Sequence, residues 1–192
     1  KCADNGIDVS FHASAPMRPE AVRVIAEQPS DDNPLIAKSE VDVRSLLGVA
    51  SWIVRMCRPA ELFPLSFFAA HAHTPTKLFV KHFSYFLAYL LERDREELTF
   101  NGHTCADNFS AFVDASLGND PRTMRSWYGY VFIWAGVIHC RSKKCPVVTL
   151  ASRDAEAVAA VMALKSSLAY RIMMAELGFG DLAPFRLRID NQ

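Results

Sequence analysis

Three acidic residues stand where a folded chain could gather them into one reactive site. Asp114 follows an apolar segment at 109–113, Asp190 follows another at 183–189, and Glu156 lies near the start of a long helical segment. Carboxylates that converge on one point repel each other unless cations lie between them. The three residues therefore predict a cation-binding site, provided that the fold brings them together.

The elements around these acids predict such a fold. The two apolar segments alternate as half-buried strands do, and residues 152–177 between them have the pattern of a helix that ends at a glycine. A strand–helix–strand unit is normally a right-handed crossover between parallel strands. If the two strands are neighbours, Asp114 and Asp190 lie together at their carboxyl ends, where open α/β sheets bind ligands. Glu156, in the first helical turn, then leans over the same edge.

Short motifs surround the acids in a fixed order: Phe-Val-Asp-Ala-Ser at 112–116, Arg-Ser-Trp-Tyr-Gly-Tyr-Val-Phe at 125–132, Ser-Lys-Lys at 142–144, Ser-Arg-Asp-Ala-Glu-Ala at 152–157 and Ile-Asp-Asn-Gln at 189–192. This order resembles the ribonuclease H domain of copia-type retrotransposon polyproteins. That family carries a tyrosine-and-aspartate strand, a lysine-rich hairpin, an S-S-x-E-A-E-Y helix start and a C-D-N-Q strand. Upstream, segments 13–17, 43–48 and 57–59 resemble its S-T-P-M, Y-R-S-L-V-G and T-R-P-D motifs. The resemblance covers nearly the whole chain, as the end of a reverse transcriptase followed by most of a ribonuclease H domain.

The resemblance implies an α/β fold class, a ribonuclease H-like mixed sheet with a crossover helix, in three regions. These are an extended arm at 1–38, a small helical bundle like a polymerase thumb or connection at 39–105, and a ribonuclease H-like domain at 106–192 that is incomplete at its C-terminus. Helix signals within the bundle predict one helix from residue 39 or 40 to Met56, a second from about Ala60, and a third capped by Thr74 before Pro75.

By the resemblance, Asp114, Glu156 and Asp190 are both the catalytic and the metal-binding residues, and they hold two Mg²⁺ ions. One ion activates a water and the other steadies the leaving 3′ oxygen during in-line hydrolysis of RNA in an RNA–DNA hybrid. Five cations in or beside a predicted hairpin, 127–134 with 137–141, are expected to contact phosphates: Arg122, Arg125, Arg141, Lys143 and Lys144. The alternative for these five is a solvated basic hairpin.

Each acid also has a purely structural interpretation. Glu156 favours the positive end of the helix dipole, and Asp114 and Asp190 can simply end strands. The family places a fourth acid on a later helix, whereas this sequence reaches Gln192 directly after the third, so we expect a weak or inactive site. The paired aspartates of a polymerase are also absent. The alternative function is a domesticated, catalytically inactive structural subunit without a cofactor, in a protein or ribonucleoprotein assembly such as an organellar or ribosomal complex.

Composition limits the choice of partner and compartment. Lys plus Arg and Asp plus Glu each number 21, so any nucleic-acid site must be a local patch. Five cysteines without a regular framework fit a reducing intracellular compartment, the cytoplasm or nucleus, or an organelle if the protein is domesticated. The pairs Cys140 with Cys145 and His71 with His73 lack the further ligands of a zinc site. No membrane span is expected, because the apolar run at 62–72 is too short and contains a proline.

Overall fold

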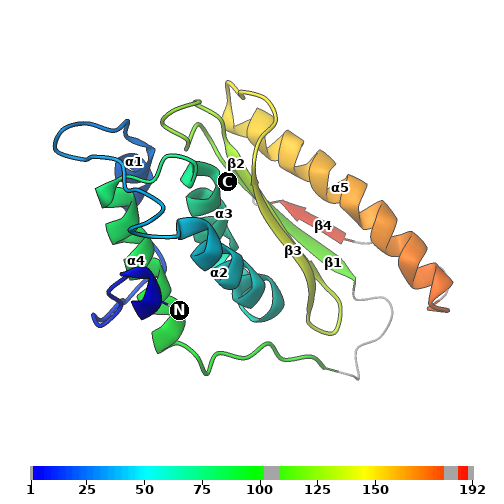
Figure 1. The fold of residues 1–192 in the computed structure, drawn as a ribbon. Coiled ribbons are helices and arrows are strands. Elements are labelled where there is room, and N and C mark those ends of the chain that lie inside the picture. Colours follow the sequence, from blue (N-terminus) through cyan, green and yellow to red (C-terminus); the bar gives the residue numbers. More distant parts are fainter. Residues whose placement is uncertain (1, 102–108, 180–185, 190–192) are drawn as a thin grey trace. The chain divides into compact units, whose positions relative to one another are not determined.

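The computed structural model describes residues 2–101, 109–179 and 186–189, and the chain forms two compact units, Lys1–Glu97 and Leu98–Gln192 (Figure 1). We call them the helical unit and the sheet unit. The domain boundary expected at 105–106 falls within 102–108, outside the described residues.

The helical unit is built around phenylalanine side chains. Its elements are η1 (Ala3–Asn5), α1 (Ala21–Ala26), α2 (Val43–Cys57), η2 (Pro59–Glu61), α3 (Leu62–His71) and α4 (Lys77–Glu92). The Phe68 ring of α3 lies 5.3–5.5 Å, between ring centroids, from the rings of Phe79, Phe83 and Phe86 on α4. All four side chains are buried, so the apolar stripe of the third predicted helix forms core.

The third helix begins later than its sequence signal predicted. The cap is Thr76, whose hydroxyl accepts a hydrogen bond from the Phe79 N–H at 3.2 Å, and not Thr74. The reason is tertiary, because the Pro75 carbonyl accepts a hydrogen bond from the Ile36 N–H at 2.9 Å. This contact with the preceding segment keeps the chain extended up to Thr76, where the helix can start.

Residues 1–38 are not uniformly extended, which corrects the expectation of an extended arm. The segment contains α1 and buries Ala13 and Ile25. Hydrogen bonds tie it to α4, with the Ala13 N–H donating to the Glu92 carboxylate and the Ser14 N–H to the Tyr85 hydroxyl, both at 3.1 Å. Since these contacts join distant parts of the chain, local periodicity does not reveal them.

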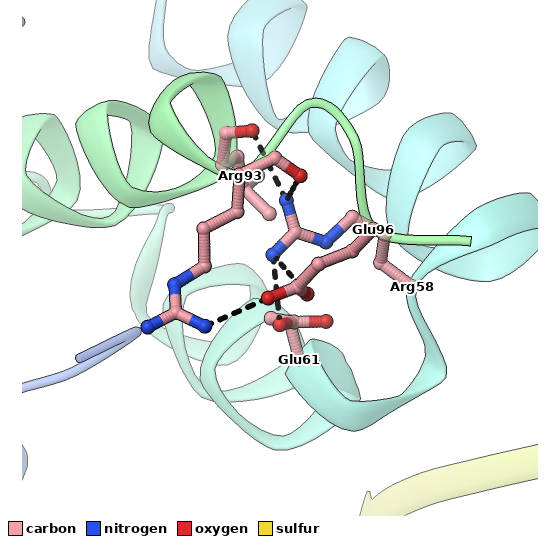
Figure 2. A network of polar contacts seen from close by, with 5 residues as sticks. Arg58, Glu61, Arg93 and Glu96 are labelled. Atoms are coloured by element: carbon pink, nitrogen blue, oxygen red, sulfur yellow. Dashed lines mark hydrogen bonds and ion pairs between the residues drawn. The ribbon is translucent and has the colours of Figure 1, made fainter. Parts of the chain in front are cut away.

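A buried ion-pair network closes the C-terminal end of α4 (Figure 2). The Arg58 guanidinium donates to the carbonyls of Leu90 (3.1 Å) and Arg93 (2.9 Å) and to the carboxylates of Glu61 (3.1 Å) and Glu96 (3.0 Å). Arg58 is 5% exposed and Glu61 3%. Because the last carbonyls of a helix lack intrahelical partners, Arg58 both caps α4 and neutralises a buried carboxylate.

The sheet unit holds a four-stranded mixed sheet in the order β3-β2-β1-β4, with strands β1 (Ser110–Ser116), β2 (Trp127–Ile133), β3 (Val137–Lys144) and β4 (Arg186–Ile189). Neighbours β1–β2 and β2–β3 are antiparallel, whereas β1 and β4 are parallel. Helix α5 (Ser152–Glu176) lies between β3 and β4 in the sequence and packs on β1 and β2 (Figure 1). The predicted mixed sheet with a crossover helix is therefore confirmed.

The core of the sheet unit lies between α5 and one face of the sheet. Ala159 and Ala163 of α5 meet buried side chains of the sheet there, namely Phe109, directly before β1, and Ala111, Val113, Tyr128, Tyr130 and Phe132 of the strands. Alanines let the helix approach the strands closely, and the aromatic rings of β2 fill the space beside them. The hairpin turns at Ala135 and Gly136 as predicted, with Ala135 at a φ of 60°.

Helix α5 ends where its glycine predicted. Gly178 has a φ of 86°, and the N–H groups of Gly178 and Phe179 donate to the carbonyls of Ala175 and Met174. These two bonds form a Schellman motif, which needs a left-handed residue at the position of Gly178.

The outer face of α5 carries an exposed apolar stripe. The side chains of Val161, Leu164, Leu168 and Ile172 are 43–62% exposed. By length and composition alone α5 could also cross a membrane, the only helix of the described residues that meets this test, although the sequence led us to expect none. Here it lies along the sheet with its alanine face covered.

Candidate functional site

The carboxyl ends of β1 and β3 and the start of α5 lie at one edge of the sheet. Ser116, Trp127 and Lys144 are paired across β1, β2 and β3, and they mark this edge. Strands β1 and β3 both end there, since each is antiparallel to β2. Residues 145–151 then lead directly into α5, so the N-terminal turns of the helix lie at the same edge. We call it the carboxyl edge.

Asp114 lies in β1 close to the carboxyl edge, two residues before the strand ends at Ser116, which corrects the prediction that it ends the strand. Its neighbours Val113 and Ala115 face α5, so Asp114 projects from the opposite face of the sheet. The carboxylate is exposed and accepts a hydrogen bond from the Ala115 N–H at 2.8 Å. It is therefore accessible to a cation from solvent.

Glu156 lies in the second turn of α5, not in the first turn as predicted, because the helix already starts at Ser152. Its side chain is half-buried. Its carboxylate accepts a hydrogen bond from the Ser152 hydroxyl at 3.4 Å, a contact within the helix. Topology thus brings β1, β4 and the start of α5 to one edge as predicted, while the two carboxylates arise from different layers. No group of three or more His, Cys, Asp or Glu in the described parts of the chain could hold a metal ion.

Asp190 lies outside the described residues. The last described residue before it, Ile189, is paired with Val113 of β1, the residue before Asp114. This register agrees with the predicted order of strands, and the meeting of all three acids remains a prediction.

Four of the five cations selected from the sequence line one pocket of about 510 Å³. They are Arg125, Arg141, Lys143 and Lys144, and Arg122 is not among the lining residues. The hairpin supplies one wall of the pocket and α5 the other, through Met162, Lys165 and Ser166. Register explains the first wall, because Arg141 is paired with Tyr130 and Lys143 with Tyr128, both of which face α5.

The sequence did not single out Lys165 or the two tyrosines as site residues. A signal for Lys165 does exist, because it falls at helical spacing from Val158 and Met162, which pack against the sheet. A lysine in that row is unexpected for a helix face that covers a core. Tyr130 carries no such signal, since a buried strand tyrosine is ordinary core, yet its hydroxyl lies 2.6 Å from the Ser166 hydroxyl.

A buried carboxylate fixes the loop between β1 and β2 to the end of β3. The Asp120 side chain is fully buried, accepts hydrogen bonds from the N–H groups of Arg122 (2.9 Å) and Thr123 (3.3 Å), and forms an ion pair with Lys144. Burial acts to raise the pKa of Asp120, but these donors and the Lys144 ammonium outweigh it and lower the pKa. The loop that carries Arg125 is therefore held in one place beside the pocket.

Hydroxyl contacts hold the same end of the unit together. The Ser126 hydroxyl lies 2.6 Å from that of Thr149 and accepts a hydrogen bond from the Gly118 N–H at 3.1 Å. The Cys145 N–H donates to the Ser126 carbonyl at 2.7 Å. These hydrogen bonds thus fix the loop between β1 and β2 to the segment between β3 and α5.

Two of the four residues considered as zinc ligands, Cys145 and His71, are buried inside their units. Cys145 is buried in the core, and burial raises its pKa, which disfavours the thiolate that binds metal. The His71 ring is 2% exposed, and its Nδ1 lies 2.9 Å from the Phe67 carbonyl oxygen.

The chain matches no protein-family model, no curated protein and no solved structure.

Proposed function

We propose that the sheet unit is a ribonuclease H-like domain of copia-type retrotransposon origin that cleaves RNA in RNA–DNA hybrids. The observation that carries the proposal is topological. The sheet has the order β3-β2-β1-β4, β1 and β4 are parallel, and α5 lies between β3 and β4 in the sequence. An acid lies in β1, in α5 and directly after β4. The basic residues at the end of the hairpin support the same function, because the substrate carries a phosphate on every nucleotide.

The residues of the proposed site have two roles, as metal ligands and as contacts to phosphates. Asp114, Glu156 and Asp190 offer carboxylate oxygens, the ligands that Mg²⁺ prefers, and the exposed Asp114 is open to an ion from solvent. Two Mg²⁺ ions held by these carboxylates would supply a water of lowered pKa and positive charge beside the leaving 3′ oxygen. Arg141 and Lys143 hold phosphates of the substrate and so orient the strand relative to the carboxyl edge.

The experiment is a cleavage assay of this chain on a labelled RNA–DNA hybrid. We expect Mg²⁺-dependent cleavage of the RNA strand and no cleavage of duplex DNA. The Asp114→Asn variant should lose at least a hundredfold in rate, since one carboxylate of a two-metal site is removed. Asp154→Asn, an exposed acid in the first turn of α5, is the matched control and should keep the rate. Absence of cleavage, or equal rates for both variants, would refute the proposal.

A second function is supported by the exposed stripe on α5. Val161, Leu164, Leu168 and Ile172 form a continuous apolar row, of the kind that subunits bury in larger assemblies. The domain would then be a catalytically inactive structural subunit without a cofactor. Recovery of the protein from its native cells as a free monomer, with no stable partner, would contradict this alternative.

A further inference from the structure

The pocket between the hairpin and α5 has a strongly one-sided charge. Arg125, Arg141, Lys143 and Lys165 line it and form no ion pair with any described residue, and no Asp or Glu is among the lining residues. Lys144 also lines the pocket, but Asp120 neutralises its charge. In a chain whose formal net charge is +0, four uncompensated cations around one cavity are a local concentration of positive charge.

The floor of the pocket supplies neutral hydrogen-bond donors. The hydroxyls of Tyr130 and Ser166 lie 2.6 Å apart at the pocket wall, and Tyr128 lies beside Arg141. Burial raises the pKa of the Tyr128 hydroxyl, so it keeps its proton at neutral pH. A ligand in this pocket therefore meets protonated hydroxyls and cations, which together favour an anion with several acceptor oxygens.

The spacing of the cations distinguishes between one anion and a chain of anions. Arg141 and Lys143 are alternate residues of β3, so they point to the same face about 7 Å apart along the strand. Lys165 faces them from α5, and Arg125 from the loop before β2. Cations spread in this way around the pocket can contact successive phosphates of one strand, so the arrangement favours a chain of phosphates over a single orthophosphate.

We propose that this pocket binds linked phosphates, and that their source is a single strand of nucleic acid. The cavity of about 510 Å³ is within the usual size range of ligand pockets. It lies on the α5 side of the sheet, and neither Asp114, which projects from the other side, nor Glu156 is among the residues that line it. The choice of nucleic acid as the source rests on the proposed function, but the binding itself needs neither metal nor cleavage.

The test is a binding measurement on the full chain without divalent metal, by fluorescence anisotropy of a labelled single-stranded DNA of about twelve nucleotides. Four phosphate contacts predict a slope of log K against log salt of roughly −3, since each contact on a single strand contributes about −0.7. Lys165→Gln and Arg141→Gln should each weaken binding about two- to fivefold and reduce that slope by about 0.7. Both side chains are exposed, so neither variant disturbs the core.

Two variants with the same loss of charge are the controls. The first control is Arg153→Gln, because Arg153 lies on α5 outside the pocket. The second is Arg188→Gln, because Arg188 lies beside Phe112 on the opposite face of the sheet. Both should bind the strand as the parent chain does. If either weakens binding as much as Lys165→Gln, the effect is general charge and the pocket assignment is wrong.

Competition by inorganic phosphate and by sodium triphosphate separates the possible sources. We expect weak competition by phosphate and intermediate competition by triphosphate. Triphosphate that binds as tightly as the strand would overturn the assignment to nucleic acid. The Asp114→Asn chain should bind the strand as the parent chain does. If the parent chain binds the strand but does not cleave the hybrid, only the nuclease proposal is refuted. If the parent chain cleaves the hybrid while Lys165→Gln leaves strand binding unchanged, only the pocket proposal is refuted.

Discussion

Replacement of Arg58 by methionine should destabilise the helical unit by about 3–5 kcal/mol. The guanidinium makes four hydrogen bonds, two to carboxylates and two to the carbonyls of Leu90 and Arg93. Its loss leaves the Glu61 carboxylate, which is 3% exposed, without a counter-charge. Removal of one partner from a buried pair typically costs this much, because the remaining charge stays desolvated. For an m-value of about 2 kcal/mol/M, the urea midpoint should fall by roughly 2 M.

Urea unfolding followed by far-ultraviolet circular dichroism measures the effect, and the network contains its own control. Arg93 forms an ion pair with Glu96 in which both side chains are nearly half exposed, so Arg93→Met should cost much less stability than Arg58→Met. The double variant of Arg58→Met with Glu61→Met should recover most of the lost stability, because no buried charge remains. Equal losses for Arg58→Met and Arg93→Met, or no recovery in the double variant, would refute this account of the network.

Three further predictions concern stability. Burial lowers the pKa of His139, so the folded state binds fewer protons than the unfolded state. The unfolding free energy should therefore fall as pH drops below about 6.5. His139→Phe should reduce this pH dependence in thermal melts between pH 7 and pH 5.5. Asp120→Asn should cost about 2–3 kcal/mol, because it removes the charge from two amide hydrogen bonds and an ion pair, and a cost below 1 kcal/mol would contradict the anchoring role. Gly178→Ala should destabilise by about 1 kcal/mol through its left-handed backbone, whereas Gly48→Ala, in an exposed and sterically open part of α2, should stabilise by about 0.5–1 kcal/mol; the same sign for both in chemical denaturation would contradict the cap assignment.

The parts of the fold that follow from local sequence were predictable. The turn at Ala135 and Gly136 and the end of α5 at Gly178 depend on the conformations that a few neighbouring residues prefer, and both were predicted correctly. The alternation of 109–113 located β1, but the strand continues to Ser116 because pairing with β2 extends it. Strand ends are set by partners, which local periodicity does not report.

The parts that depend on distant contacts were not predictable in the same way. The start of α4 at Lys77 depends on a hydrogen bond between Pro75 and Ile36. The conformation of residues 1–38 depends on their hydrogen bonds to α4. The pocket shows the same limit. The cations of the hairpin could be recognised in the sequence as a charge cluster. Lys165 lines the pocket only because α5 packs beside the hairpin in the fold, which the sequence pattern does not show.

The most direct test of the central claim is the placement of a divalent ion by nuclear magnetic resonance, with Mn²⁺ as a paramagnetic substitute for Mg²⁺. Because the ion broadens nearby amide signals, substoichiometric Mn²⁺ should broaden Ala115 in β1 and Ala157 in α5 together, and Asp114→Asn should abolish both effects. Broadening of only one of these signals, or of neither, would contradict the claim that Asp114 and Glu156 share one metal site.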